Sequence, residues 1–152
     1  MQLTELLSPD RIKIPLAATT KDEILAELVE VVAQNSSVRD EGEVLRAVRE
    51  REEVLSTGIG GGVAIPHGKT PGIPYLALVA GVKPGGLDFE ALDGKPVKLF
   101  FLLVGPESAA GQHVKALSRI SRLLRRDSFR IRLMDATTPA DFYSIIAEAE
   151  AT

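Results

Sequence analysis

The sequence predicts a mixed β-sheet packed between layers of helices, and two observations carry that prediction. Helical patterns occupy the beginning and the end of the chain, whereas strand patterns occupy the middle. Two of these strands, residues 75–83 and 97–104, are apolar along their length, which is typical of strands covered on both faces. The two helical regions can supply the covering layers on either side of such a sheet.

The composition is that of one ordinary globular domain, which we expect to span residues 1–152. Hydrophobic residues make up 45% and charged residues 26%, and there is no cysteine, which excludes disulfides, thiolate metal sites and cysteine nucleophiles. The longest apolar runs, residues 75–82 and 99–105, fall short of the ~20 residues that a transmembrane helix needs. The first residues lack the features of a signal peptide. We therefore expect a soluble, cytoplasmic protein without membrane insertion.

The N-terminal third predicts a short strand followed by two helices. Residues 12–16 read as a brief strand, and Pro15 suits the edge of a sheet. Thr20 then begins a capping box, and apolar residues at helical spacing continue the helix to about Gln34. A second helix follows at about residues 40–53.

The central region alternates irregular segments with strands. Residues 56–62 are too rich in glycine for a helix or a regular strand, and residues 67–72 are irregular as well. A short extended segment, residues 63–66, separates them. Turn signals at residues 84–86 and 92–95 lie between the two apolar strands.

The C-terminal third predicts three helices. The first covers about residues 111–126 and turns its leucine and isoleucine side chains inward. A short helix is expected at residues 129–134. The last helix begins with Thr138 as its cap and Pro139 in its first turn.

The net charge of −3 is unevenly distributed. Residues 1–53 hold 12 acids and seven bases, whereas residues 113–134 hold seven bases and one acid. The outward arginines of this basic stretch, Arg119, Arg122 and Arg126, either contact an acidic partner or anion or form a solvated helix face. The negative overall charge and the aromatic content of 5% argue against a nucleic acid partner.

Residues suited to chemistry gather around His67. This histidine lies in a polar turn after the glycine-rich segment, and Gly68 beside it permits close approach of another molecule. The consecutive glycines expose backbone N–H groups that can converge on an anion, and Ser56 and Thr57 add hydroxyl donors. The spacing matches neither a Walker A loop nor a dinucleotide fingerprint. A surface histidine beside a flexible loop is the plain alternative.

Two further residues could assist at this site. Arg51 ends the second predicted helix, and a guanidinium suits bidentate contact with phosphoryl oxygens. Its acidic neighbours, Glu52 among them, make a salt-bridged surface the alternative. His113 lies at the start of a predicted helix, where the helix dipole disfavours the imidazolium form. We expect both Arg51 and His113 to be exposed.

These groups together suit phosphoryl transfer. An imidazole nitrogen can attack a phosphoryl group and hold it as a phosphoramidate that stays reactive. The transition state spreads charge over the phosphoryl oxygens, so the protein mainly needs positioned donors. The chain offers no convincing carboxylate pair for Mg²⁺, and we expect neither a metal nor another cofactor. A hydrolase built on Ser56 and His67 would lack a nucleophile elbow and an orienting acid.

Residues 51–70 resemble the active-site segment of the type-2 enzyme IIA domains of the bacterial phosphoenolpyruvate-dependent sugar phosphotransferase system (PTS), in its fructose, mannitol and nitrogen-regulatory branch. The pattern Ser-Thr-Gly-Ile-Gly followed by Ile-Pro-His-Gly carries the resemblance, which extends from residues 21–28 to residues 142–146. It implies an α/β fold, a three-layer α/β/α sandwich around a mixed sheet.

The resemblance also implies a role for each candidate residue. His67 would be the phosphorylated nucleophile, and Arg51 and His113 would stabilise the phosphoryl group. The phosphoryl-binding loop would consist of Ser56, Thr57 and Gly58.

A cycle of transfer follows from the same resemblance. The histidine-containing phosphocarrier protein would give the phosphoryl group to His67, which would pass it to a cysteine of a sugar-specific enzyme IIB. In the nitrogen-regulatory branch the phosphorylation state would instead regulate a target protein. A lone domain suits that branch slightly better, but the motif also occurs in the fructose branch. The alternative function is a non-catalytic docking module switched by phosphorylation.

Overall fold

Two long antiparallel strands form the middle of the sheet, β5 (Ala77–Leu87) and β6 (Val97–Gly105). Successive side chains of a strand point to opposite faces. Along β6, Phe101 therefore enters one hydrophobic core and Phe100 enters the other. Residues 77–82 of β5 and 99–104 of β6 are buried on both faces, as their apolar sequence predicts, whereas Lys98 of β6 is exposed.

Four shorter strands complete the mixed sheet. At one edge β1 (Ile12–Lys13) pairs in parallel with β5. On the other side of β6 lie β3 (Val63–Ala64) and β4 (His67–Lys69), which pair in parallel with successive parts of it. Finally, β2 (Gly58–Gly60) pairs antiparallel with β3, which gives the order β1-β5-β6-β3-β2.

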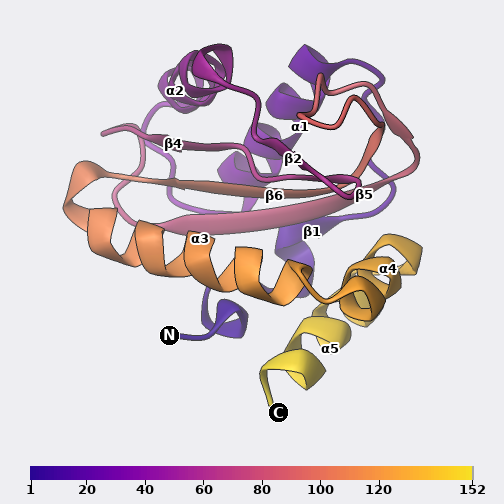
Figure 1. Cartoon of the computed structure of the whole chain (residues 1–152). Helices are drawn as coiled ribbons and strands as arrows, with labels where there is room; N and C mark the ends of the chain where they lie inside the picture. Colours follow the sequence, from indigo (N-terminus) through magenta and orange to yellow (C-terminus); the bar gives the residue numbers. More distant parts are fainter. Residues whose placement is uncertain (152) are drawn as a thin grey trace.

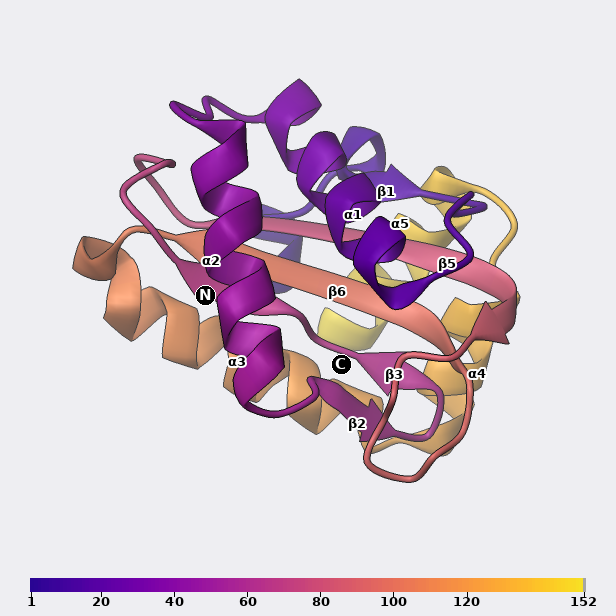
Figure 2. The same cartoon turned by 90° about the horizontal axis from the view of Figure 1, so that it is seen from above.

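Helices cover both faces of the sheet (Figure 1). One face is covered by α1 (Lys21–Asn35) and α2 (Glu41–Val54), and the other by α3 (Ala110–Leu124), α4 (Asp127–Asp135) and α5 (Pro139–Glu150). Figure 2, a view from above, shows α1 and α2 in front of the sheet and the remaining helices behind it. This arrangement in the computed structural model confirms the predicted three-layer α/β/α sandwich.

The helix caps follow the predicted pattern. The hydroxyl of Thr20 accepts the N–H of Glu23 at 3.2 Å at the start of α1. The hydroxyl of Thr138 likewise accepts the N–H of Asp141 at 3.1 Å at the start of α5. Each cap satisfies an N–H group that has no partner inside its helix, which sets where the helix begins.

The structure describes residues 1–151, so that Thr152, the last residue of the predicted domain, lies outside the described residues. Three short 3₁₀-helices, η1 (Leu3–Glu5), η2 (Pro9–Arg11) and η3 (Glu107–Ala109), connect the larger elements. No helix among residues 1–151 is both long enough and apolar enough to cross a membrane.

Two segments predicted to be irregular are strands, which corrects the sequence analysis. Residues 58–60 and 67–69 form β2 and β4, because neighbouring strands offer them backbone hydrogen-bond partners. The turn signal at residues 84–86 is also wrong. Gly85 and Gly86, with φ of +83° and +75°, lie within β5 at a place where its register against β6 shifts.

Candidate functional site

His67 is the first residue of β4, at the side of β6 that lies away from β5. The strand passes between α2 and α3 (Figure 1). Its two faces differ: the His67 ring meets α3, and Gly68 meets α2. A Cβ on Gly68 would lie 3.2 Å from the backbone nitrogen of Val48 in α2. Gly68 thus admits a helix of its own chain, which corrects the expectation that it admits another molecule.

The His67 ring is held in one tautomer. Its Nδ1 lies 2.9 Å from the carbonyl oxygen of Ile65. Because a carbonyl only accepts hydrogen bonds, Nδ1 carries the proton and Nε2 keeps a free lone pair. A half-buried neutral ring with a free Nε2 has the form that a nucleophilic histidine requires.

Burial lowers the pKa of His67 below its usual 6.5, and the positive charges of Arg51 and Lys69 lower that pKa further. The hydrogen bond to Ile65 and the negative charge of Glu52 act in the opposite direction. The net lowering keeps the ring of His67 neutral at pH 7.

His113 packs against His67 from α3. The two ring centroids are 5.7 Å apart and the ring planes lie at 72°. Burial lowers the pKa of His113 to about 4, with smaller contributions from the charges of His67 and Lys69. Among residues 1–151, Nδ1 of His113 has no hydrogen-bond partner. His113 therefore offers a second neutral imidazole with an unsatisfied polar atom.

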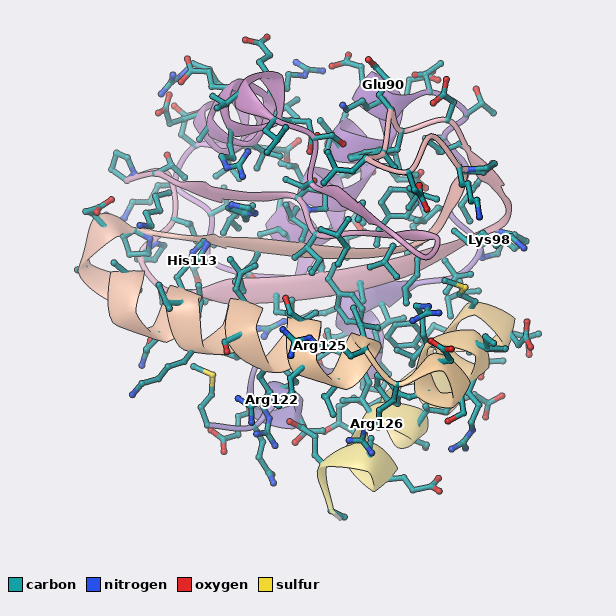
Figure 3. All side chains as sticks on the ribbon, in the orientation of Figure 1. Glu90, Lys98, His113, Arg122, Arg125 and Arg126 are labelled. Atoms are coloured by element: carbon teal, nitrogen blue, oxygen red, sulfur yellow. The ribbon has the colours of Figure 1, made fainter. Side chains whose placement is uncertain are left out.

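The side chain of His113 is only 3% exposed, so the expectation that it lies on the surface is wrong. It shares the inner face of α3 with Ala116 and Ile120, because residues three and seven positions apart lie on one side of a helix. Figure 3 shows the His113 side chain between α3 and the sheet. Its neighbour Val114 points outward and is 64% exposed.

Arg51 reaches the site from the opposite helical layer. It lies in the last turn of α2, is half-buried, and donates from Nη1 to the carbonyl oxygen of Leu55 at 2.9 Å. Its charge acts on the pKa of His67. The structure thus brings the rings of His67 and His113 into contact, and Arg51 acts on His67 through its charge.

Ser56 lies on the segment that links α2 to β2, and Gly58 is the first residue of β2. The hydroxyl of Ser56 accepts the N–H of Gly58 at 3.1 Å and lies 3.4 Å from the carbonyl oxygen of Phe89. A Cβ on Gly58 would lie 2.7 Å from the Cβ of Ala91. Glycine is therefore required at position 58 by the close approach of the segment that contains Ala91.

Thr57 faces the interior, and both of its donors are already bound. Its N–H donates to Glu52 at 2.8 Å, and its hydroxyl donates to the other oxygen of the same carboxylate. Its carbonyl oxygen accepts the N–H of Ile65 at 3.0 Å, which fixes this segment to the strand that leads to His67. Thr57 thus contributes to the site through its backbone.

The remaining glycines of the loop lie far from His67, which corrects the expected anion nest. Gly60, Gly61 and Gly62 form the tip of the β2–β3 hairpin, and all three have positive φ. The N–H of Gly61 is taken by the carboxylate of Asp93 at 3.2 Å. The residues of β6 that pair with Val63 and His67 are four positions apart, which is about 13 Å along a strand.

The predicted site does not include Glu52, because the sequence analysis considered it only as part of a salt-bridged surface around Arg51. The structure buries it to 6% exposure and pairs it with Lys21 at 3.2 Å. One signal in the sequence could have indicated this position. Glu52 follows the apolar Val48 by four residues and therefore shares the inner face of α2.

The predicted basic face of α3 is only partly free. Arg119 donates from Nε to the buried carboxylate of Glu150 at 2.6 Å. Arg122, in the last turn of α3, and Arg126, just beyond its end, are exposed, and Figure 3 shows them with Arg125 away from His113. The arginine cluster is thus separate from the histidine pair.

The family model described as "Phosphoenolpyruvate-dependent sugar phosphotransferase system, EIIA 2" matches residues 5–149. The chain belongs to this family. The match confirms the resemblance on which the expected roles of His67, Arg51 and His113 depend. The family includes both nitrogen-regulatory and sugar-specific members.

Relatives of this EIIA domain come from both branches. The nitrogen regulatory protein of Bradyrhizobium diazoefficiens is 37% identical over 152 residues, 100% of this chain and 99% of the relative. The PTS fructose-specific EIIABC component of Bacillus subtilis is 37% identical over 146 residues, 96% of this chain and 23% of that longer protein. The crystal structure of nitrogen regulatory protein IIA-Ntr from Neisseria meningitidis has a TM-score of 0.87 at 30% identity, covering 95% of this chain and 98% of that one.

Proposed function

We propose that this EIIA domain, residues 1–152, is a phosphoryl carrier whose His67 accepts its phosphoryl group from the histidine-containing phosphocarrier protein. The observation that carries the proposal is the bonding of the His67 ring. Nδ1–H is bound to the Ile65 carbonyl oxygen, and Nε2 is free to attack phosphorus. Membership in a phosphoenolpyruvate-dependent phosphotransfer family supports the choice of reaction. The cytoplasmic location expected from the sequence belongs to this proposal.

The proposed step exchanges one N–P bond for another. The lone pair of His67 Nε2 attacks the phosphorus atom, and the bond from phosphorus to the donor's histidine nitrogen breaks. The donor imidazole leaves with the electron pair of that bond. Positive charge develops on the His67 ring, and the hydrogen bond from Nδ1–H to the Ile65 carbonyl stabilises it, consistent with the upward effect of this bond on the pKa of His67.

The neighbouring groups would stabilise the transferred phosphoryl oxygens. Arg51 supplies positive charge and N–H donors from α2, and His113 supplies a neutral imidazole from α3. The loop of Ser56, Thr57 and Gly58 would line the site, with Thr57 acting through its backbone. No step in this scheme uses a metal or another cofactor.

The phosphoryl group would then leave by one of two routes. A cysteine thiolate of an enzyme IIB attacks the phosphorus, an S–P bond forms as the Nε2–P bond breaks, and Nε2 takes the electron pair of that bond, so that His67 returns as a neutral ring. The relation to a fructose-specific EIIABC component supports this route. The relation to a nitrogen regulatory protein along almost its full length supports the second route, in which phospho-His67 regulates a target protein.

Phosphorylation with purified components tests the carrier function. The chain is incubated with enzyme I, the phosphocarrier protein and labelled phosphoenolpyruvate. We expect one acid-labile, base-stable label per chain, and no label on the His67→Ala variant. His113→Gln, with a similar size and polarity, should still fold and should accept the label more slowly.

Four outcomes distinguish the proposals. Label that persists in His67→Ala contradicts the assignment of the acceptor. Label that passes from phospho-His67 to a purified enzyme IIB supports the transport route. A binding partner that discriminates between the phosphorylated and the free chain supports the regulatory route. Binding that is the same with and without phosphorylation contradicts that route and the switch, and favours docking by the fold alone.

A further inference from the structure

Glu52 is a buried carboxylate that the proposed reaction does not yet use. Its side chain is 4% exposed, whereas its neighbours in α2 are half-buried (Arg51) and exposed (Glu53). Burial of a carboxylate costs several kcal/mol unless charges and hydrogen bonds compensate it. The compensating groups come from the start of α1 and from the segment between α2 and β2.

Three groups surround this carboxylate. The N–H of Thr57 lies 2.8 Å from Oε2, and the Thr57 hydroxyl donates to Oε1. The ammonium of Lys21, at the start of α1, lies 3.2 Å from Oε2. The same ammonium lies 4.8 Å from the centre of the Phe89 ring, so Lys21 is itself held in place. Glu52 thus fixes Thr57 to both α1 and α2.

A continuous series of hydrogen bonds leads from Glu52 to the His67 ring. Glu52 binds the N–H of Thr57, and the Thr57 carbonyl oxygen accepts the N–H of Ile65 at 3.0 Å. The Ile65 carbonyl oxygen in turn accepts Nδ1–H of His67 at 2.9 Å. Each step passes from the N–H to the carbonyl of one residue, through the Cα of Thr57 and then of Ile65, so the series fixes the positions of these groups relative to one another.

We propose that Glu52 is a positioning residue, which acts through Thr57 and Ile65 to hold Nδ1–H of His67 and so to keep Nε2 free as the nucleophile. The inference rests on the proposed function as far as the nucleophile is concerned. The orientation of the ring is a property of the free protein and can be measured without any partner.

Glu52 also contributes charge at the site. The charged groups that act on the His67 ring are Arg51 and Glu52 from α2 and Lys69 from β4, and the neutral ring of His113 from α3 packs against it. Glu52 is the one carboxylate in this set, and its negative charge raises the pKa of His67 against the lowering by burial and by the two cations. A neutral residue of the same shape would keep most of the packing and lose this effect.

The test compares Glu52→Gln with Glu53→Gln, which changes the exposed neighbour on the same helix turn. Nitrogen-15 chemical shifts of the His67 ring report its tautomer, and a pH titration reports its pKa. For Glu52→Gln we expect a mixture of both tautomers, a lower pKa of His67, and amide exchange at Thr57 about tenfold faster, since a charge-assisted hydrogen bond is lost. Transfer to His67 should slow about tenfold or more through misalignment. Glu53→Gln should change none of these.

Two results would overturn parts of this picture separately. If Glu52→Gln keeps the wild-type tautomer, His67 pKa and transfer rate while only its melting temperature falls, Glu52 merely stabilises the fold and the inference is wrong. If the tautomer and Thr57 exchange change as expected but the wild-type chain accepts no phosphoryl group, the positioning role stands and the carrier function fails.

Discussion

At the scale of single residues, the site is a pair of neutral imidazoles with different bonding. His67 has one nitrogen bound to Ile65 and the other free, whereas His113 has a buried Nδ1 that is unpaired among residues 1–151. A buried polar atom without a partner costs about 1–3 kcal/mol. Such a cost is understandable where a ligand supplies the missing partner, and an incoming phosphoryl group at His67 could do so.

Removal of the Arg51 charge should change both the pKa and the reactivity of His67. We expect Arg51→Ala to raise the pKa of His67, because the positive charge of Arg51 lowers it in the wild type. Phosphoryl transfer should slow about 10- to 100-fold with the loss of a donor to the transition state. An NMR titration and a transfer assay measure the two effects. The control Arg49→Ala changes another arginine of α2 and removes its exposed ion pair to Asp22 of α1. A similar change in the pKa of His67 in Arg49→Ala would contradict the assignment of the effect to Arg51.

The pH dependence of stability should reveal the burial of His113. Its pKa is about 4 in the folded chain and 6.5 ordinarily, so between these values the unfolded chain binds more protons. Stability therefore falls as pH falls from about 6.5 toward 4. The His113 contribution at pH 5 should be about 2 kcal/mol lower than at pH 7.

Urea unfolding at pH 7, 6 and 5 measures this dependence. His113→Gln should flatten it, since glutamine does not titrate. His67 has a pKa shifted in the same direction and leaves a residual slope. Buried carboxylates affect stability at lower pH. Burial raises the pKa of Glu150, but Arg119 and two backbone amides lower that pKa to below its usual 4.5. An unchanged slope in His113→Gln would rule out the buried neutral histidine.

At the scale of elements, two glycines set how closely the segments around His67 approach. Gly68 lets β4 lie against the backbone of α2, and Gly58 lets β2 lie against Ala91. Both contacts are with backbone or with a short side chain, which cannot rotate away. The position of β4, and with it the position of His67, depends on the first of these contacts.

Alanine at either glycine should destabilise the fold. We expect Gly68→Ala and Gly58→Ala each to lower the free energy of unfolding by about 1–3 kcal/mol, because the added methyl group has no room. Gly111→Ala in α3 is the matched control, since its Cβ would meet nothing within 4 Å. It should stabilise by about 0.4–1 kcal/mol through the unfolded state. Denaturant titrations decide, and equal effects at all three positions would refute the packing explanation.

The elements differ in how far their sequences predict them. The caps at Thr20 and Thr138 and the apolar runs of β5 and β6 are local signals, and the structure agrees with them. In contrast, β2 and β4 are three-residue strands that contain glycine and only one apolar side chain between them, Ile59, and they are too short to show a period of two. The pairing of His67 with Leu103, distant in the sequence, makes β4 a strand. No local pattern encodes such a partner.

At the scale of the whole molecule, one carboxylate joins the two ends of the chain. Glu150, in the last turn of α5, accepts the N–H groups of Leu3 at 2.7 Å and Thr4 at 3.0 Å and also binds Arg119 of α3. Figure 1 shows the two termini on the same side of the molecule, below the sheet. The N-terminal segment, α3 and α5 thus form one unit on that face.

Loss of this carboxylate should weaken the whole unit. We expect Glu150→Ala to lower the free energy of unfolding by about 2–4 kcal/mol, because two amides and a guanidinium lose their buried partner. Glu148→Ala removes an exposed ion pair to Arg132 and should cost less than about 1 kcal/mol. Denaturant unfolding gives both values. Amide exchange at Leu3 and Thr4 should become faster in Glu150→Ala and not in Glu148→Ala. If exchange at these two amides is not faster in Glu150→Ala, other contacts hold the N-terminal segment.

For the candidate site as a whole, the sequence predicts which residues take part better than it predicts how they are arranged. Arg51, His67 and His113 follow from residue chemistry and from the family resemblance, and in the structure the two histidine rings are in contact and the charge of Arg51 acts on His67. The burial of His113 and of Glu52 depends on which helix face meets the sheet. The predicted anion nest is wrong because a run of glycines is as typical of a hairpin turn, here residues 60–62, as of a loop that binds an anion.

The side-by-side arrangement of a buried His113 and an exposed Val114 offers a practical means of observation. The chain contains no cysteine, so a single cysteine at position 114 would provide a unique thiol for a fluorophore. Such a dye would stand one residue from the histidine pair without entering it. Its emission would report, in real time, the arrival and departure of any protein that covers the surface beside the histidine pair.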